Sequence, residues 1–116
     1  MKLYVPSIGD SIILTKDWSF SLEDEYRNDT LYDFLTGKPR ARDWTRWQSR
    51  PGGAINGNLP AGTVLTVDRI YIKKGRADYN SITFMVKKTP FYKKGKLRFW
   101  VKLKDANEIE FEPYIP

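Results

Sequence analysis

The sequence predicts a mainly β protein, a small five-stranded antiparallel barrel with a short helix and a long basic loop inserted after the first strand. Three observations lead to this fold class. Apolar and polar residues alternate over residues 10–22. Segments 62–74, 80–88 and 96–104 are rich in β-branched and aromatic residues, and glycine and proline occupy the connections between them. Closure into a barrel removes exposed sheet edges, which would aggregate.

The first predicted strand covers residues 10–22, where Lys16 alone interrupts the alternation. This length suits a strand that bends around a small barrel. A short helix is predicted next, because Asn28 or Asp29 can cap its N-terminus and Gly37, followed by a proline, can end it. The residues expected to face the core are Ile12, Leu14, Trp18, Phe20 and Leu22 of the strand and Leu31, Phe34 and Leu35 of the helix.

Residues 38–61 contain three prolines and three glycines and show no sustained period. This composition predicts a long basic loop, and a loop of that length in a small domain is usually functional or mobile. The chain of 116 residues is long enough to bury one core without a disulfide or a metal. We therefore expect a single domain over 1–116, with an insertion at 23–58.

The three later strand-like segments have short connections, which predicts an antiparallel meander. The sequence KDAN at 104–107 suggests one tight turn, and EIEFEP at 108–113 alternates as a closing strand. Within 96–104 we expect Phe99 to face the core and its neighbour Trp100 to face outward on an open surface, because successive strand side chains point to opposite faces.

The phrases LPAGTVLTVDRIYI (59–72), SITFMV (81–86), RFWVKL (98–103) and IEF (109–111) together resemble the layout of SH3-like small barrels. The resemblance covers about half of the chain. It implies an SH3-like five-stranded barrel, a class whose members bind peptides, nucleic acid or cell-wall polymers. The insertion at 23–58 departs from the minimal pattern, so the resemblance does not locate a ligand groove.

The chain contains no histidine and no cysteine. The commonest general base, thiol nucleophile and neutral metal ligand are therefore missing, and we expect neither an enzyme nor a cofactor or metal site. The one acidic cluster is expected to be a solvated turn and helix start rather than a cation site; it comprises Glu23, Asp24, Glu25, Asp29 and Asp33. Without cysteines, signal peptide or long apolar run, the chain is expected to be cytoplasmic and without a membrane partner.

The net charge of +6 is unevenly distributed, because residues 38–104 carry seventeen basic and three acidic side chains. A polyanion or an acidic protein surface is therefore the expected partner. Alternation predicts a basic and aromatic face that suits phosphates and stacked bases of single-stranded nucleic acid. The alternative is a solubilising surface on which the long loop covers Trp100. The candidate residues are Arg69, Tyr71, Lys73, Lys87, Arg98, Trp100 and Lys102, with Lys93 and Lys94 in a loop.

A second candidate surface lies in the predicted basic loop, where arginines alternate with tryptophans: Arg40, Arg42, Trp44, Arg46, Trp47 and Arg50. Guanidinium groups bind phosphate or carboxylate, and indole rings stack or fill a partner's pocket. The alternative is that the two tryptophans form a hydrophobic lid over the barrel.

Two function classes follow from these patterns. The first is a non-catalytic module that binds nucleic acid, single-stranded by preference, with low sequence specificity. The second is a protein-interaction module, an adaptor or inhibitor encoded by a phage or a bacterium, whose basic loop docks on an acidic partner.

Overall fold

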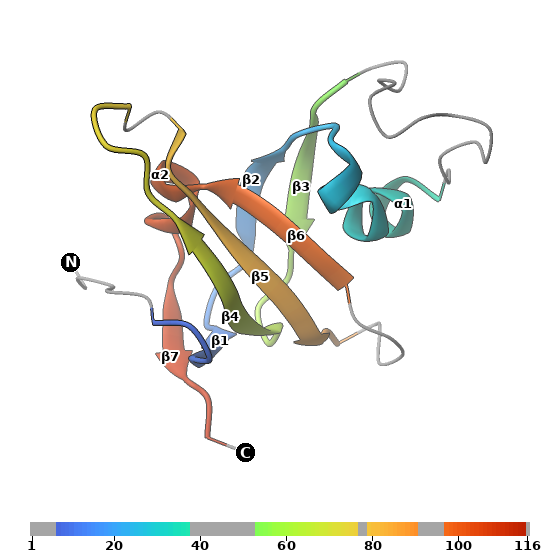
Figure 1. The fold of residues 1–116 in the computed structure, drawn as a ribbon. Coiled ribbons are helices and arrows are strands. Elements are labelled where there is room, and N and C mark those ends of the chain that lie inside the picture. The colour runs from blue at the N-terminus through green and yellow to red at the C-terminus, as the bar shows by residue number, and fades with distance from the viewer. Residues whose placement is uncertain (1–6, 38–52, 77–78, 91–96, 116) are drawn as a thin grey trace.

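The computed structural model describes residues 7–37, 53–76, 79–90 and 97–115. It confirms a mainly β fold with a five-stranded antiparallel sheet and a short helix. The strand order of this sheet is β6-β5-β4-β1-β7, and β2 and β3 form a second sheet (Figure 1). The strands are β1 (Ser11–Leu14), β2 (Trp18–Leu22), β3 (Ile55–Leu59), β4 (Val64–Tyr71), β5 (Ser81–Lys88), β6 (Leu97–Lys102) and β7 (Phe111–Pro113).

The prediction of one continuous strand over 10–22 is wrong, because the segment forms β1 and β2 in two different sheets. The chain turns at Thr15–Asp17, next to Lys16, the residue that interrupts the alternation. Asp17 accepts a hydrogen bond from the backbone N–H of Ala61 at 2.8 Å, and Gly62 donates to the carbonyl of Leu14 at 2.8 Å. These bonds join the turn between β1 and β2 to the turn between β3 and β4. The two turns therefore lie side by side where the chain passes from one sheet to the other.

The predicted loop 38–61 is corrected at its end, where Ile55–Leu59 forms β3. Its sequence, INGNL, has low β propensity. Antiparallel pairing with all five residues of β2 compensates for this. Gly57 pairs with Phe20 and leaves room for its ring, because a Cβ atom at Gly57 would lie 2.6 Å from Phe20 Cε2.

Replacing Gly57 with alanine is therefore expected to lower the free energy of unfolding by about 1–3 kcal/mol, the usual cost of forcing an extra group into a packed core. Chemical denaturation measures this change. Asn56→Ala, at an exposed position of the same strand, is the matched control and should change stability by less than about 0.5 kcal/mol. Equal stabilities of the two variants would show that Phe20 does not pack on Gly57.

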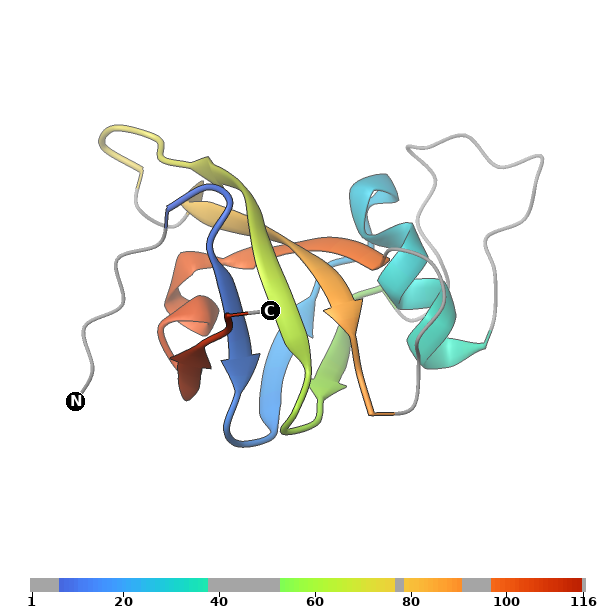
Figure 2. The ribbon, with the colours of Figure 1, turned by 90° about the horizontal axis from the view of Figure 1, so that it is seen from below.

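The predicted meander is confirmed as β4, β5 and β6, which pair antiparallel in succession. β6 ends at Lys102 rather than at 104, because Leu103–Ala106 forms one turn of helix, α2, in place of the predicted tight turn. The closing strand β7 is shorter than predicted. No closed barrel is detected among the described residues. Figure 2 shows the two sheets as facing layers with the core between them.

The core between the sheets is aromatic at its centre. Phe20 and Phe99 are stacked, with ring centroids 5.3 Å apart, and Phe84 lies 5.8 Å from Phe99. Trp18 contacts all three rings, and its Nε1 donates to the backbone carbonyl of Asp105 in α2 at 3.1 Å. The five apolar residues predicted to face inward from 10–22 are all buried.

Helix α1 (Asp29–Thr36) ends at Gly37, as predicted, with a left-handed φ of 68°. A 3-10 turn, η1 (Tyr26–Asn28), precedes it. Asn28 occupies the N-cap position of α1, as predicted, but its side chain makes no capping bond: its Nδ2 donates to the carbonyl of Glu23, and its Oδ1 accepts from the backbone N–H of Trp100. Thr30 donates to the carbonyl of Arg98 and accepts from its N–H. β6 is an edge strand of the larger sheet. The side chains of Asn28 and Thr30 thus bond backbone groups of β6 that a further strand would otherwise pair with.

Candidate functional site: a groove over β4, β5 and β6

The outer face of the meander is hollowed along β5. Ser81 and Thr83 face outward because Ile82 and Phe84, which alternate with them, are fully buried. Small side chains on the central strand lie between larger ones on both neighbouring strands, so a groove forms. The cross-strand neighbours are Tyr71 and Arg69 on β4 and Lys102 and Trp100 on β6.

A β-bulge in β4 determines which of its side chains reach this groove. Val67 is buried, but the register shifts after it, and Arg69 pairs with the outward residue Thr83. Arg69 is exposed, whereas strict alternation from Val67 would have buried it. Asp68, the extra residue of the bulge, forms an ion pair with Arg98 of β6 at 3.0 Å.

The first wall of the groove belongs to the connection between β4 and β5. Tyr71 and Tyr79 are each 51% exposed. The guanidinium carbon of Arg76 lies 4.4 Å from the Tyr79 ring centroid, and Nζ of Lys73 lies 5.5 Å from it. Asn80 accepts a hydrogen bond from the backbone N–H of Lys73 at 2.8 Å. This wall therefore presents accessible aromatic rings together with cations.

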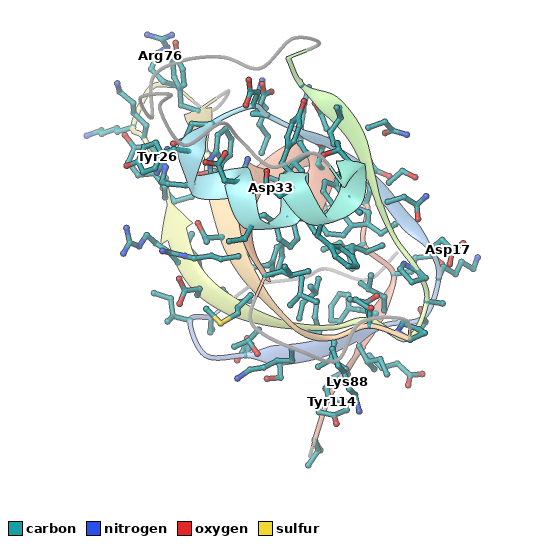
Figure 3. The ribbon with its side chains drawn as sticks, turned by 90° about the vertical axis from the view of Figure 1, so that its right-hand side faces the viewer. Asp17, Tyr26, Asp33, Arg76, Lys88 and Tyr114 are labelled. Carbon is teal, nitrogen blue, oxygen red and sulfur yellow. The ribbon has the colours of Figure 1, made fainter. Side chains whose placement is uncertain are left out.

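The second wall is the segment 23–27. The Glu25 carboxylate accepts hydrogen bonds from Nε1 of Trp100 at 2.5 Å and from Nε of Arg27 at 2.8 Å. The Arg27 guanidinium also lies 5.7 Å from the Trp100 ring centroid. The expectation of an open surface at Trp100 is therefore corrected, since its ring faces outward but is partly covered. In Figure 3 the labelled Tyr26, from the segment 23–27, and Arg76, from the connection between β4 and β5, lie toward the same side of the molecule.

The groove has a volume of about 820 Å³. Four basic and three acidic side chains line it, together with three aromatic side chains and the small hydroxyl side chains of Ser81 and Thr83. The groove thus combines both signs of charge with rings on which a flat ligand can stack. The lining residues are Glu23, Asp24, Glu25, Arg27, Arg69, Tyr71, Lys73, Tyr79, Ser81, Thr83, Trp100 and Lys102.

The structure brings some of the predicted site residues together in this groove and leaves others apart from it. Those that line the groove are Arg69, Tyr71, Lys73, Trp100 and Lys102. Arg98 is paired with Asp68, and Lys87 is exposed on β5 but does not line the groove. The remaining predicted residues lie outside the described ranges: Lys93, Lys94, Arg40, Arg42, Trp44, Arg46, Trp47 and Arg50.

The sequence analysis did not predict the floor of the groove, formed by Ser81 and Thr83, or its acidic wall, the segment 23–27. The alternation of side chains along β5 places Ser81 and Thr83 on the outer face, so the floor of the groove could be predicted from the sequence. The sequence predicts a solvated turn at Glu23 and Glu25, and no local pattern links them to β6, whose Trp100 and Lys102 they join in the groove lining. Their position follows from Asn28, whose side chain bonds both Glu23 and Trp100.

Within the described ranges, no group of three or more acidic, histidine or cysteine side chains is arranged to hold a metal ion. No helix in the described part of the chain is long and apolar enough to cross a membrane. Eleven of the twenty basic and twelve of the fourteen acidic residues fall within the described ranges, so the whole of the positive excess belongs to the remaining segments.

Comparisons of the chain with protein-family models, curated proteins and solved structures find no match.

Proposed function

We propose that this chain is a non-catalytic module that binds single-stranded nucleic acid with low sequence specificity in the groove over β4, β5 and β6. The observation that carries the proposal is the wall on which half-exposed Tyr71 and Tyr79 stand beside Arg69 and Lys73. Exposed rings stack on bases of any sequence, and neighbouring cations attract the phosphates. The absence of histidine and cysteine from the sequence agrees with a role without catalysis.

Two further properties are proposed with this function. The paired corners of β1–β2 and β3–β4 are consistent with an open form of the SH3-like layout, in which two bent strand pairs pass from one sheet to the other. A cytoplasmic location agrees with the cysteine-free composition.

Replacing Tyr79 with alanine is expected to weaken binding of a labelled single-stranded oligonucleotide by about 1–3 kcal/mol, the contribution of one stacked base. Fluorescence anisotropy at low salt measures this loss.

Lys102→Gln should instead lower the affinity for all sequences alike and reduce the slope of log affinity against log salt by about one unit. Lys104→Gln, an exposed cation that does not line the groove, is the control for Lys102.

The alternative is a protein-interaction module, an adaptor or inhibitor of phage or bacterial origin. The observation that favours it is that basic and acidic side chains are nearly equal in number in the described part of the chain. A surface with so little net charge attracts a polyanion only weakly. If the unmodified protein does not bind single strands even at low salt, the nucleic-acid proposal fails. Capture of one acidic protein partner would then favour the alternative.

A further inference from the structure

One short segment of the chain, residues 25–28, holds Trp100 at both its backbone and its side chain. The backbone N–H of Trp100 donates to Oδ1 of Asn28 at 2.7 Å, and its indole Nε1 donates to Oε2 of Glu25 at 2.5 Å. Nε1 is the only polar atom of the indole, and the ring turns about only two side-chain torsions. The two bonds together therefore determine the orientation of the ring.

The Glu25 carboxylate is itself held by Arg27. Nε of Arg27 donates to Oε2 at 2.8 Å and to Oε1 at 3.0 Å, and the backbone N–H of Arg27 donates to Oε1 at 3.3 Å. Hydrogen bonds to an ionised carboxylate are stronger than bonds between neutral groups. Glu25 is therefore fixed in place as the acceptor for the indole N–H.

Arg27 also offsets the charge of Glu25. A lone carboxylate in the groove would repel the phosphates that the proposed function places there. The Arg27 guanidinium forms an ion pair with this carboxylate at 2.8 Å and lies 5.7 Å from the Trp100 ring centroid. The acceptor and its cation together carry no net charge, so they oppose a polyanion little.

The place of Trp100 in the fold suits a binding role. Trp100 is partly exposed and lines the groove, whereas its neighbour Phe99 is fully buried between the two sheets. An exposed ring that is fixed before binding loses less conformational entropy when a ligand stacks on it. Support of a binding side chain by a second residue is the usual way to fix such a ring.

We propose, on the basis of the function proposed above, that Trp100 is a second stacking ring of the groove and that Glu25 is its positioning residue. A base of the single strand stacks on the indole, across β5 from Tyr71 of the first wall. Glu25 acts through Trp100, because its hydrogen bond keeps the ring in the orientation that it has in the free protein.

The test compares two substitutions of Glu25 that remove the same charge. Glu25→Gln keeps an oxygen atom that can accept from Nε1 of Trp100, whereas Glu25→Ala removes it. The alanine variant is expected to bind oligodeoxythymidine about fivefold more weakly than the glutamine variant, as loss of part of one stacking contact implies. Anisotropy titrations at low salt measure both affinities, at a temperature at which thermal unfolding shows both variants to be folded.

Trp100→Ala removes the ring on which Glu25 is proposed to act, and by itself should weaken binding about tenfold. In this background Glu25→Gln and Glu25→Ala should have equal affinities, because neither residue can position a ring that is absent. Glu112→Gln and Glu112→Ala are the matched control, at an exposed position of β7 outside the groove lining. These two variants should also have equal affinities.

The outcomes separate this inference from the function on which it rests. Equal affinities of the two Glu25 variants would overturn the positioning role, whatever their stabilities, because a purely structural role changes stability alone. A difference that persists in the Trp100→Ala background would also overturn it, since Glu25 would then act through another contact. In both cases binding by the unmodified protein leaves the proposed function standing. No binding of the probe by the unmodified protein would overturn the proposed function and this inference together.

Discussion

Replacing Phe99 with alanine is expected to lower the free energy of unfolding by about 3–5 kcal/mol, the usual cost of truncating a buried aromatic side chain. Phe99 is fully buried in β6, where it stacks on Phe20 of the second sheet and contacts Phe84 of the neighbouring strand. The variant therefore loses contacts that join the two sheets. Chemical denaturation of both proteins measures the difference.

The matched control is Trp100→Ala, one position away on the opposite face of the same strand. Trp100 is partly exposed and contacts Glu25 and Arg27 rather than the aromatic core. Its loss is expected to cost about 1–2 kcal/mol, because a half-exposed side chain contributes less buried apolar surface. If Trp100→Ala proved more destabilising than Phe99→Ala, the register of β6 described here would be wrong.

Replacing Asn28 with alanine is expected to destabilise the protein by about 2–4 kcal/mol. Asn28 is fully buried and bonds two backbone groups, the carbonyl of Glu23 at 3.1 Å and the N–H of Trp100 at 2.7 Å. Alanine leaves both groups without this partner, and each unsatisfied buried group costs about 1–3 kcal/mol. Denaturation midpoints and the slope of the transition measure the change.

Thr30→Val is the control for Asn28, because Thr30 also bonds the backbone of β6 but is exposed. Water can replace its hydroxyl group, so we expect a loss below about 1 kcal/mol. Asn28→Ala should also weaken oligonucleotide binding more than Thr30→Val does, since Asn28 holds the segment 23–27 against the groove. Equal stability losses in the two variants would show that burial does not increase the contribution of the Asn28 hydrogen bonds to the free energy of unfolding.

Part of the candidate site could be predicted from the sequence and part could not. Alternation along 97–102 places Trp100 and Lys102 on the outer face, and the structure brings them into the groove with Arg69. The prediction for Arg69 depended on a bulge in β4, which has no clear sequence signal. The acidic wall was not predicted, because Glu25 reaches Trp100 only through contacts between segments 75 positions apart in the chain.

The sequence by itself determined the local features of this protein. Side-chain alternation reflects the pleat of a single strand, so the buried set from Ile12 to Leu22 could be read from the chain, and so could the meander. The end of α1 at Gly37 could also be read from the sequence, because glycine adopts a left-handed φ at little cost in free energy.

Only the tertiary structure decided how these local features are joined. It divided 10–22 between two sheets and made a strand of INGNL by pairing it with β2. It also brought the acidic segment 23–27 against β6 to form the second wall of the groove. The physical reason is that strand pairing and edge coverage draw their free energy from partners distant in sequence, whereas local propensity reports only on neighbouring residues.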